Sequence, residues 1–146
     1  MSKVVVVIGS ESDRGLAEKA EAVLKEFGVA CEVHVASAHR TPERVKNLAE
    51  REDVDVFIAI AGLSAALPGA IASHTIKPVI GVPREVKLLG LDALLAIAQL
   101  PPGIPVATVG IDNAKNAALL AVEILALKDE ELRAKLEEFR RKMRGE

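Results

Sequence analysis

Short runs of β-branched and other apolar residues alternate with helical patterns along the whole sequence, and this alternation restricts the fold more than any other feature. The strand-like runs cover residues 3–8, 33–35, 55–61, 78–83 and 106–109. Each is followed by residues with helical spacing or by a helix start signal. Because crossovers between parallel strands are right-handed, five successive βα units predict an α/β fold with one parallel sheet and helices on both of its faces.

The expected helices differ in how their apolar residues are distributed. The first ends at Gly28 and is amphipathic, as expected for a helix that packs on a sheet. Residues 91–100 are apolar on nearly every side, which indicates burial in the core or in a subunit interface, and we favour the interface. Asp129 is expected to cap a charged last helix over about 129–144.

Length and composition exclude several classes of protein. A chain of 146 residues predicts one domain, residues 1–146, with a three-layer αβα architecture. Nineteen basic residues against twenty-one acidic ones, with three Phe and no Tyr or Trp, argue against nucleic acid as a partner. No apolar run is long enough to span a membrane, and residues 1–3 lead into a strand without signal-peptide features. We therefore expect a cytoplasmic protein.

The lone cysteine of the sequence offers little chemistry. Cys31 has no second cysteine with which to form an intramolecular disulfide, and no Cys/His spacing in the chain suggests a zinc site. We therefore expect no metal.

The first strand ends at Gly9-Ser10-Glu11-Ser12-Asp13, where glycine allows a tight turn and two hydroxyls precede a helix. Such a corner can bind an anion. The motif differs from the dinucleotide-binding and Walker motifs, so neither of those functions is supported. The alternative is that Ser10, Ser12 or Asp13 only caps the helix.

Polar chemistry also follows the second strand, at Ser37-Ala38-His39-Arg40-Thr41-Pro42. Thr41 and Pro42 have the pattern of an N-cap followed by proline at the first helical position. The hydroxyl of Ser37, the imidazole of His39 and the guanidinium of Arg40 therefore lie at the carboxyl end of a strand, where open α/β sheets bind ligands. A surface turn with incidental polar residues is the alternative.

The third strand ends at Gly62, and the residues after it are small and apolar. Residues 63–69 lead into a helix that we expect to extend through Ser73, and they would let the backbone approach a ligand closely. Three strand ends are thus expected to converge on one site.

The motifs at these strand ends resemble the PurE family of purine biosynthesis, and the order and spacing agree along nearly the whole chain. The segments that carry the resemblance are Gly9-Ser10-Glu11-Ser12-Asp13, Ser37-Ala38-His39-Arg40-Thr41-Pro42, Ala61-Gly62 with Leu67-Pro68-Gly69, Gly81-Val82-Pro83, Gly90-Leu91-Asp92 and Gln99-Leu100-Pro101-Pro102-Gly103-Ile104-Pro105-Val106-Ala107-Thr108.

The resemblance implies a flavodoxin-like α/β fold, a homo-octamer and an enzyme without metal or organic cofactor. It implies conversion of N5-carboxyaminoimidazole ribonucleotide to 4-carboxyaminoimidazole ribonucleotide, or direct carboxylation of aminoimidazole ribonucleotide with carbon dioxide. It assigns proton transfer to His39 and the ribose phosphate to Ser10, Asp13 and Arg40. The substrate site that it implies also includes Ser12, Ser37, Gly62, Ser64, Ala65 and Leu67.

The chain departs from the common bacterial pattern of the family at two places. Ala66 stands where those members usually carry histidine. Ser64 and the short loop 110–116 are more similar to archaeal and carbon dioxide-using members, so the carboxyl donor stays open. His34, within a strand, and His74, near a helix end, are expected to be structural because neither follows a glycine-rich strand end.

Two other functions compete with the enzyme. A flavodoxin-like signalling module of the receiver type needs a phosphoacceptor aspartate after the third strand, where this chain has Gly62 and Leu63. A non-catalytic binding or assembly module stays possible because fold does not imply function and a usual histidine is replaced by Ala66.

Overall fold

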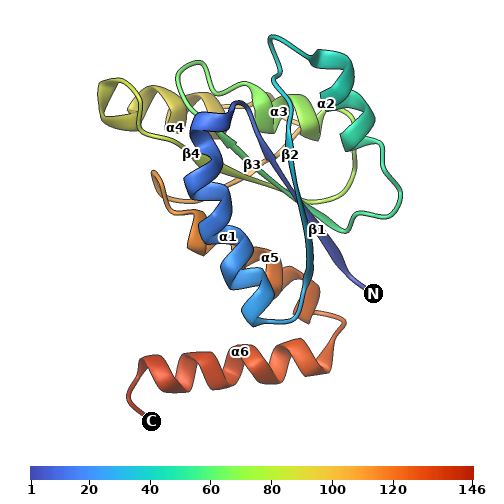
Figure 1. Cartoon of the computed structure of the whole chain (residues 1–146), viewed down its shortest axis with the longest axis vertical. Helices are drawn as coiled ribbons and strands as arrows, with labels where there is room; N and C mark the ends of the chain where they lie inside the picture. Colours follow the sequence, from blue (N-terminus) through green and yellow to red (C-terminus); the bar gives the residue numbers. More distant parts are fainter.

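The computed structural model describes residues 1–146 and has a parallel sheet between two layers of helices (Figure 1). The strands lie in the order β2-β1-β3-β4-β5, and every neighbouring pair is parallel. This is the flavodoxin-like order, so the predicted three-layer fold is confirmed. The strands are β1 (Lys3–Ile8), β2 (Ala30–Val35), β3 (Val56–Ala61), β4 (Val79–Pro83) and β5 (Ala107–Thr108).

The helices separate into two groups, one on each face of the sheet (Figure 1). One face is covered by α1 (Arg14–Glu26) and α5 (Ala114–Ala126). The other is covered by α2 (Pro42–Ala49), α3 (Leu67–Ala72) and α4 (Leu91–Ala98). Two short 3-10 helices, η1 (Glu11–Asp13) and η2 (Leu88–Gly90), precede α1 and α4.

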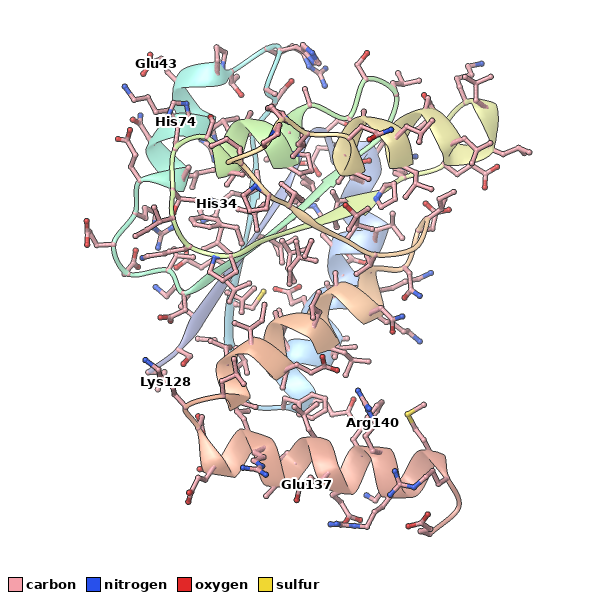
Figure 2. The ribbon with its side chains drawn as sticks, turned by 180° about the vertical axis from the view of Figure 1, so that it is seen from behind. His34, Glu43, His74, Lys128, Glu137 and Arg140 are labelled. Carbon is pink, nitrogen blue, oxygen red and sulfur yellow. The ribbon has the colours of Figure 1, made fainter.

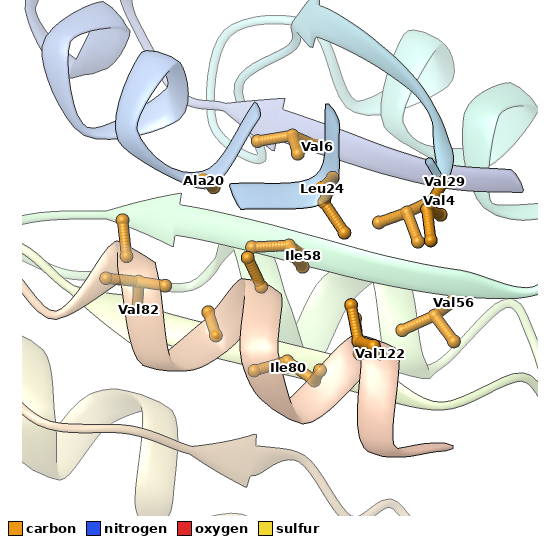
Figure 3. Packing of buried hydrophobic residues seen from close by; sticks show 14 of the residues in the cluster. Val4, Val6, Ala20, Leu24, Val29, Val56, Ile58, Ile80, Val82 and Val122 are labelled. Atoms are coloured by element: carbon orange, nitrogen blue, oxygen red, sulfur yellow. The ribbon is translucent and has the colours of Figure 1, made fainter. Parts of the chain in front are cut away.

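Alternate residues of the central strands pack into two separate cores. In β1, Val4 and Val6 face α1 and α5, whereas Val5 and Val7 face the layer that contains α2 and α3, and all four are fully buried. Figure 3 shows the first core, in which valines and isoleucines of the sheet meet Leu24 of α1. Each such buried side chain stabilises the fold by roughly 1.5–3 kcal/mol.

The last helix, α6 (Glu130–Met143), lies outside the three layers and packs against α5 (Figure 1). The rings of Phe27 and Phe139 meet edge to face, with their centroids 5.7 Å apart. Arg140 Nη2 donates to Glu123 Oε1 on α5 at 2.7 Å, and Figure 2 shows Arg140 between the two helices. No helix of the chain combines the length and the apolar composition that crossing a membrane requires.

The predicted elements are present, with differences at their ends. The Asp129 carboxylate accepts the N–H of Leu132 at 3.1 Å, so the predicted cap of the last helix is confirmed. The helix expected to run through Ser73 is the short α3, which has Pro68 in its first turn. The last strand, predicted over residues 106–109, pairs with β4 only at Ala107 and Thr108.

The segment predicted to be buried on all sides is covered on one side in the single chain. Ala93 and Ile97 of α4 are fully buried, whereas Leu91 and Leu95 are 52% and 55% exposed. The buried side lies so close to β4 that a Cβ at Gly81 would collide with Ile97. The sheet thus covers one face of α4 and leaves Leu91 and Leu95 exposed.

A cluster of charged side chains joins the start of β1 and the interior of β2 to the loop before β3. The Glu32 carboxylate lies 2.8 Å from Lys3 Nζ, Arg51 Nη1 and His34 Nε2, and Arg51 also pairs with Asp53 at 2.7 Å. Hydrogen bonds from Arg51, Lys3 and His34, in this order of importance, hold the pKa of Glu32 well below its usual range. His34 thus has a structural partner, as predicted.

Glu32→Gln should lower the free energy of unfolding at pH 7 by about 1 kcal/mol, the upper end of the range for partly exposed ion pairs. A carboxylate with a lowered folded-state pKa stabilises above its unfolded pKa and loses this effect as the pH falls through the folded value. The difference from the wild type should therefore shrink below about pH 4.5, the reference value of the carboxyl group. Urea unfolding at fixed protein concentration measures it.

The matched control is Glu131→Gln, because Glu131 is an exposed residue of α6 that lies 3.8 Å from Lys135. It should stay within about 0.5 kcal/mol of the wild type at each pH. A Glu32→Gln difference that does not change between pH 7 and pH 3 would contradict the electrostatic role of Glu32.

Candidate active site

The carboxyl ends of β1, β2, β3 and β4 meet at one edge of the sheet, and the loops after them enclose a pocket of about 340 Å³. This volume is suitable for a small ligand. Every predicted site residue lines the pocket except Ser37. The lining residues are Gly9, Ser10, Ser12, Asp13, Ala38, His39, Arg40, residues 61–67, Arg84 and Val86.

The loop after β1 is built around a buried carboxylate. Asp13 is 4% exposed, and its Oδ2 accepts the backbone N–H of Ser10 at 3.1 Å. The hydroxyls of Ser10 and Ser12 are hydrogen-bonded to each other, and both residues line the pocket. Asp13 therefore fixes the shape of the corner, and the two hydroxyls are left at the pocket wall.

Arg40 connects the loop after β2 with the loop after β1. Its Nη2 donates to the carbonyl oxygen of Gly9 at 3.2 Å, and its Nε lies 3.4 Å from Ser37 Oγ. Ser37 also accepts the backbone N–H of Arg40, so it holds the arginine from outside the pocket. Thr41 is the N-cap residue before Pro42, but its Oγ1 bonds to Ser37 and does not cap α2.

The three histidines lie in different surroundings. His39 is exposed at the pocket and makes no side-chain hydrogen bond within the chain, so both of its ring nitrogens are available to a ligand. His34 belongs to the charged cluster around Glu32. His74, labelled in Figure 2, lies in the loop after α3 and lines a different surface depression. Of the three histidines, only His39 lines the pocket.

The third wall of the pocket is the turn between β3 and α3. Ala65 N–H donates to the carbonyl of Gly62 at 3.1 Å, and Leu63 adopts a left-handed backbone with φ 52°. A Cβ on Gly62 would lie 2.6 Å from Val86 Cγ2 and 3.3 Å from the carbonyl oxygen of Arg84. Glycine at position 62 therefore allows the loops after β3 and β4 to approach each other.

The loop after β4 supplies two pocket residues that the sequence analysis did not nominate, Arg84 and Val86. Arg84 Nη1 lies 3.1 Å from Asp13 Oδ1 and 3.1 Å from Ser12 Oγ. Arg84 directly follows Pro83, the last residue of β4. The principle that ligands bind at the carboxyl ends of parallel strands, which identified the first three loops, would also have identified this one.

Neither a metal site nor a reactive thiol accompanies the pocket. No three His, Cys, Asp or Glu side chains in the chain are close enough together to hold a metal ion. Cys31 packs against the first core, and burial raises the pKa of its thiol to about 12.

The sheet order and the polar pocket at its carboxyl edge define a flavodoxin-like α/β protein with a ligand site at the usual edge of the sheet. The model of the AIR carboxylase family matches residues 3–146, and the chain therefore belongs to this family. The predicted resemblance is confirmed.

Similar proteins agree with this assignment. A Methanocaldococcus jannaschii protein named N5-carboxyaminoimidazole ribonucleotide mutase is 63% identical over 141 residues, which are 97% of this chain and 90% of that protein. A Pyrococcus abyssi protein of the same name is 53% identical over 99% of this chain and 85% of its own length. The crystal structure of Treponema denticola PurE has a TM-score of 0.89 and 31% identity, over 99% of this chain and 93% of that one.

Gly62→Ala should destabilise the fold by about 1–3 kcal/mol, the usual cost of overpacking, because the new methyl group collides with Val86. The collision should also move Arg84 and lower activity. Gly62→Ala combined with Val86→Ala removes the shortest contact and should recover most of the lost stability in thermal or urea unfolding.

Gly110→Ala is the control for this substitution, because a Cβ at Gly110 would make only an ordinary contact with Asn113, at 3.8 Å. It should leave stability within about 0.5 kcal/mol of the wild type. If Gly62→Ala and Gly110→Ala changed the stability equally, the close approach of the two loops would not be the reason for glycine at position 62.

Proposed function

We propose that this protein is an N5-carboxyaminoimidazole ribonucleotide mutase of purine biosynthesis and acts through the pocket at the carboxyl edge of its sheet. The observation that carries the proposal is that one pocket contains a titratable imidazole, His39, beside a polar corner and the guanidinium of Arg40. Relatives that are 63% and 53% identical have the name of this activity.

The substrate phosphate is assigned to the outer part of the pocket. Arg40 is exposed, fixed by Ser37 and Gly9, and close to the loop that carries the hydroxyls of Ser10 and Ser12. An arginine fork and serine hydroxyls suit the oxygens of a doubly charged phosphate. Phosphate near this rim would leave the ring of the nucleotide over the inner wall, which is made by residues 61–67.

His39 is assigned the proton transfers. When the carboxylate moves, the exocyclic nitrogen loses carbon dioxide and gains a proton, and the ring carbon that receives the carboxylate loses its hydrogen. One imidazole can donate the first proton and accept the second, because the pKa of histidine is near neutral pH. Since no protein group binds the His39 ring, neither nitrogen has to be released before it can act.

The transferred carboxyl group is proposed to come from the carboxylated nitrogen of the substrate itself. The relatives' names support transfer from the carboxylated nitrogen over direct carboxylation with carbon dioxide. Ala66, where bacterial members usually carry histidine, lines the pocket without adding a second titratable group. The proposed mechanism therefore uses one histidine and no cofactor.

His39→Asn should reduce turnover by about a hundred- to ten-thousandfold, the usual contribution of a general acid or base, with near-normal nucleotide binding. The amide is smaller than the ring and cannot titrate, and His39 is exposed, so melting temperature should change little. Ultraviolet assays with N5-carboxyaminoimidazole ribonucleotide measure the effect.

Two comparisons interpret this result. His74→Asn should leave turnover within a few fold, since His74 is also exposed but lies outside the pocket. Wild-type activity with aminoimidazole ribonucleotide plus bicarbonate, and none with the carboxylated substrate, would instead identify a direct carboxylase. Absence of both activities in the wild type would favour a non-catalytic module.

We also propose that the chain forms a homo-octamer in which the leucines around α4 are covered by neighbouring copies. Leu88, Leu89, Leu91 and Leu95 are 72%, 74%, 52% and 55% exposed and follow one another along η2 and α4. Leu88 and Leu89 have left-handed backbones, with φ of 50° and 59°. Strained leucines directed to solvent are costly unless another surface covers them.

Size-exclusion chromatography with light scattering should give the mass of eight chains at micromolar concentration. Leu95→Glu, a change at an exposed position of α4, should shift the protein to smaller species while helix content is retained. Leu127→Glu is the control, because Leu127 is 84% exposed and lies in the turn after α5. A monomeric wild-type protein would contradict the assembly.

A further inference from the structure

Arg84 is a second cation in the pocket, and only part of its guanidinium is used by the protein. Its Nη1 lies 3.1 Å from both Asp13 Oδ1 and Ser12 Oγ. Its Nε and Nη2 donate to no protein acceptor, and the side chain is 29% exposed where it lines the pocket. Three N–H donors of a fixed planar cation are therefore available to a ligand.

The backbone that carries Arg84 is held in place on both sides. Arg84 N–H donates to the carbonyl of Ala61 at 3.0 Å and so extends the pairing of β3 with β4. The next N–H, that of Glu85, donates to Asp112 Oδ1 at 2.9 Å. Gly62 also approaches this loop closely, because a Cβ at position 62 would lie only 3.3 Å from the carbonyl oxygen of Arg84. Arg84 is thus a preorganised group, as a binding residue should be.

The two arginines of the pocket hold opposite ends of one polar corner. Arg40 bonds to the carbonyl of Gly9 at its beginning, and Arg84 bonds to Ser12 and Asp13 at its end. Two separate guanidinium groups around one corner suit a ligand with two separate anionic groups.

The charge of the pocket supports the same conclusion. The charged lining residues besides His39 are Asp13, Arg40 and Arg84, and their formal charges sum to one net positive charge. Without Arg84, the carboxylate of Asp13 would cancel Arg40. A nucleotide with a phosphate and a carboxylate would then enter a site with no net attraction for it.

We propose that Arg84 binds the carboxylate that the enzyme transfers, a role that rests on the function proposed above. Arg40 is exposed at the rim and suits the strongly hydrated phosphate, whereas Arg84 is half-buried beside Gly62 and Val86. A carboxylate on a flat ring matches the planar fork of an arginine. An arginine guanidinium does not act as an acid or base in proteins, so the carboxylate would be held by a group that takes no part in the proton transfers.

The test compares two nucleotides that differ by one carboxylate, in calorimetric titrations with aminoimidazole ribonucleotide and with 4-carboxyaminoimidazole ribonucleotide. Arg84→Gln should weaken binding of the carboxylated nucleotide by roughly ten- to hundredfold, the range for a charge-assisted hydrogen bond. Binding of the other nucleotide should change by less than about threefold. Arg40→Gln should weaken the binding of both nucleotides to a similar degree, because both nucleotides carry the phosphate.

Two further variants make the result independent of folding effects. Arg84→Lys keeps a cation beside Asp13 but loses the planar pair of N–H donors. It should still weaken binding of the carboxylated nucleotide selectively, by several fold. Lys87 lies in the same loop but outside the pocket, so Lys87→Gln should change the affinity for neither nucleotide.

Equal weakening of both nucleotides by Arg84→Lys and Arg84→Gln would show that Arg84 acts by holding Asp13, and would overturn the proposal. No change in either affinity would also overturn it. Both of these results leave the proposed function intact, because the wild type still binds the nucleotides. A wild type that binds neither nucleotide would reject the proposed function itself.

Discussion

The burial of β1 and β3 on both faces determines where this protein can place polar chemistry. Every residue from Val56 to Ile60 is fully buried, as is every residue from Val4 to Ile8, so no functional side chain can project from the middle of these strands. A polar group buried there without a partner would cost several kcal/mol. Because all five strands are parallel, their carboxyl ends share one edge, and four of the loops there build the pocket.

The pocket is held together mainly by two arginines and one buried carboxylate. Arg40 joins the loop after β2 to the loop after β1, and Arg84 joins the loop after β4 to the same place through Asp13. The loop after β3 needs no side chain for this purpose, because Gly62 lets its backbone approach the loop after β4. Groups fixed in this way are ready to bind charge without reorganising.

The features that could be predicted from the sequence depend on neighbours along the chain. The β-branched run that ends at Gly9 and the helix cap at Asp129 are local patterns, and both are present. Arg84 follows a strand end and could have been nominated on that ground, but its pairing with Asp13, 71 positions away, appears only in the fold. The apolar pattern of residues 91–100 favoured an interface, and Leu91 and Leu95 are exposed in the single chain, but the pattern does not say which surface covers them.

A crystal structure with bound 4-carboxyaminoimidazole ribonucleotide tests the central claim most directly, which is that one pocket at the carboxyl edge holds the whole reacting nucleotide. The phosphate should lie within hydrogen-bond distance of Arg40 and Ser10, the carboxylate should face Arg84, and the ring should lie within reach of His39. A nucleotide bound outside this pocket, or with its ring turned away from His39, would contradict the account.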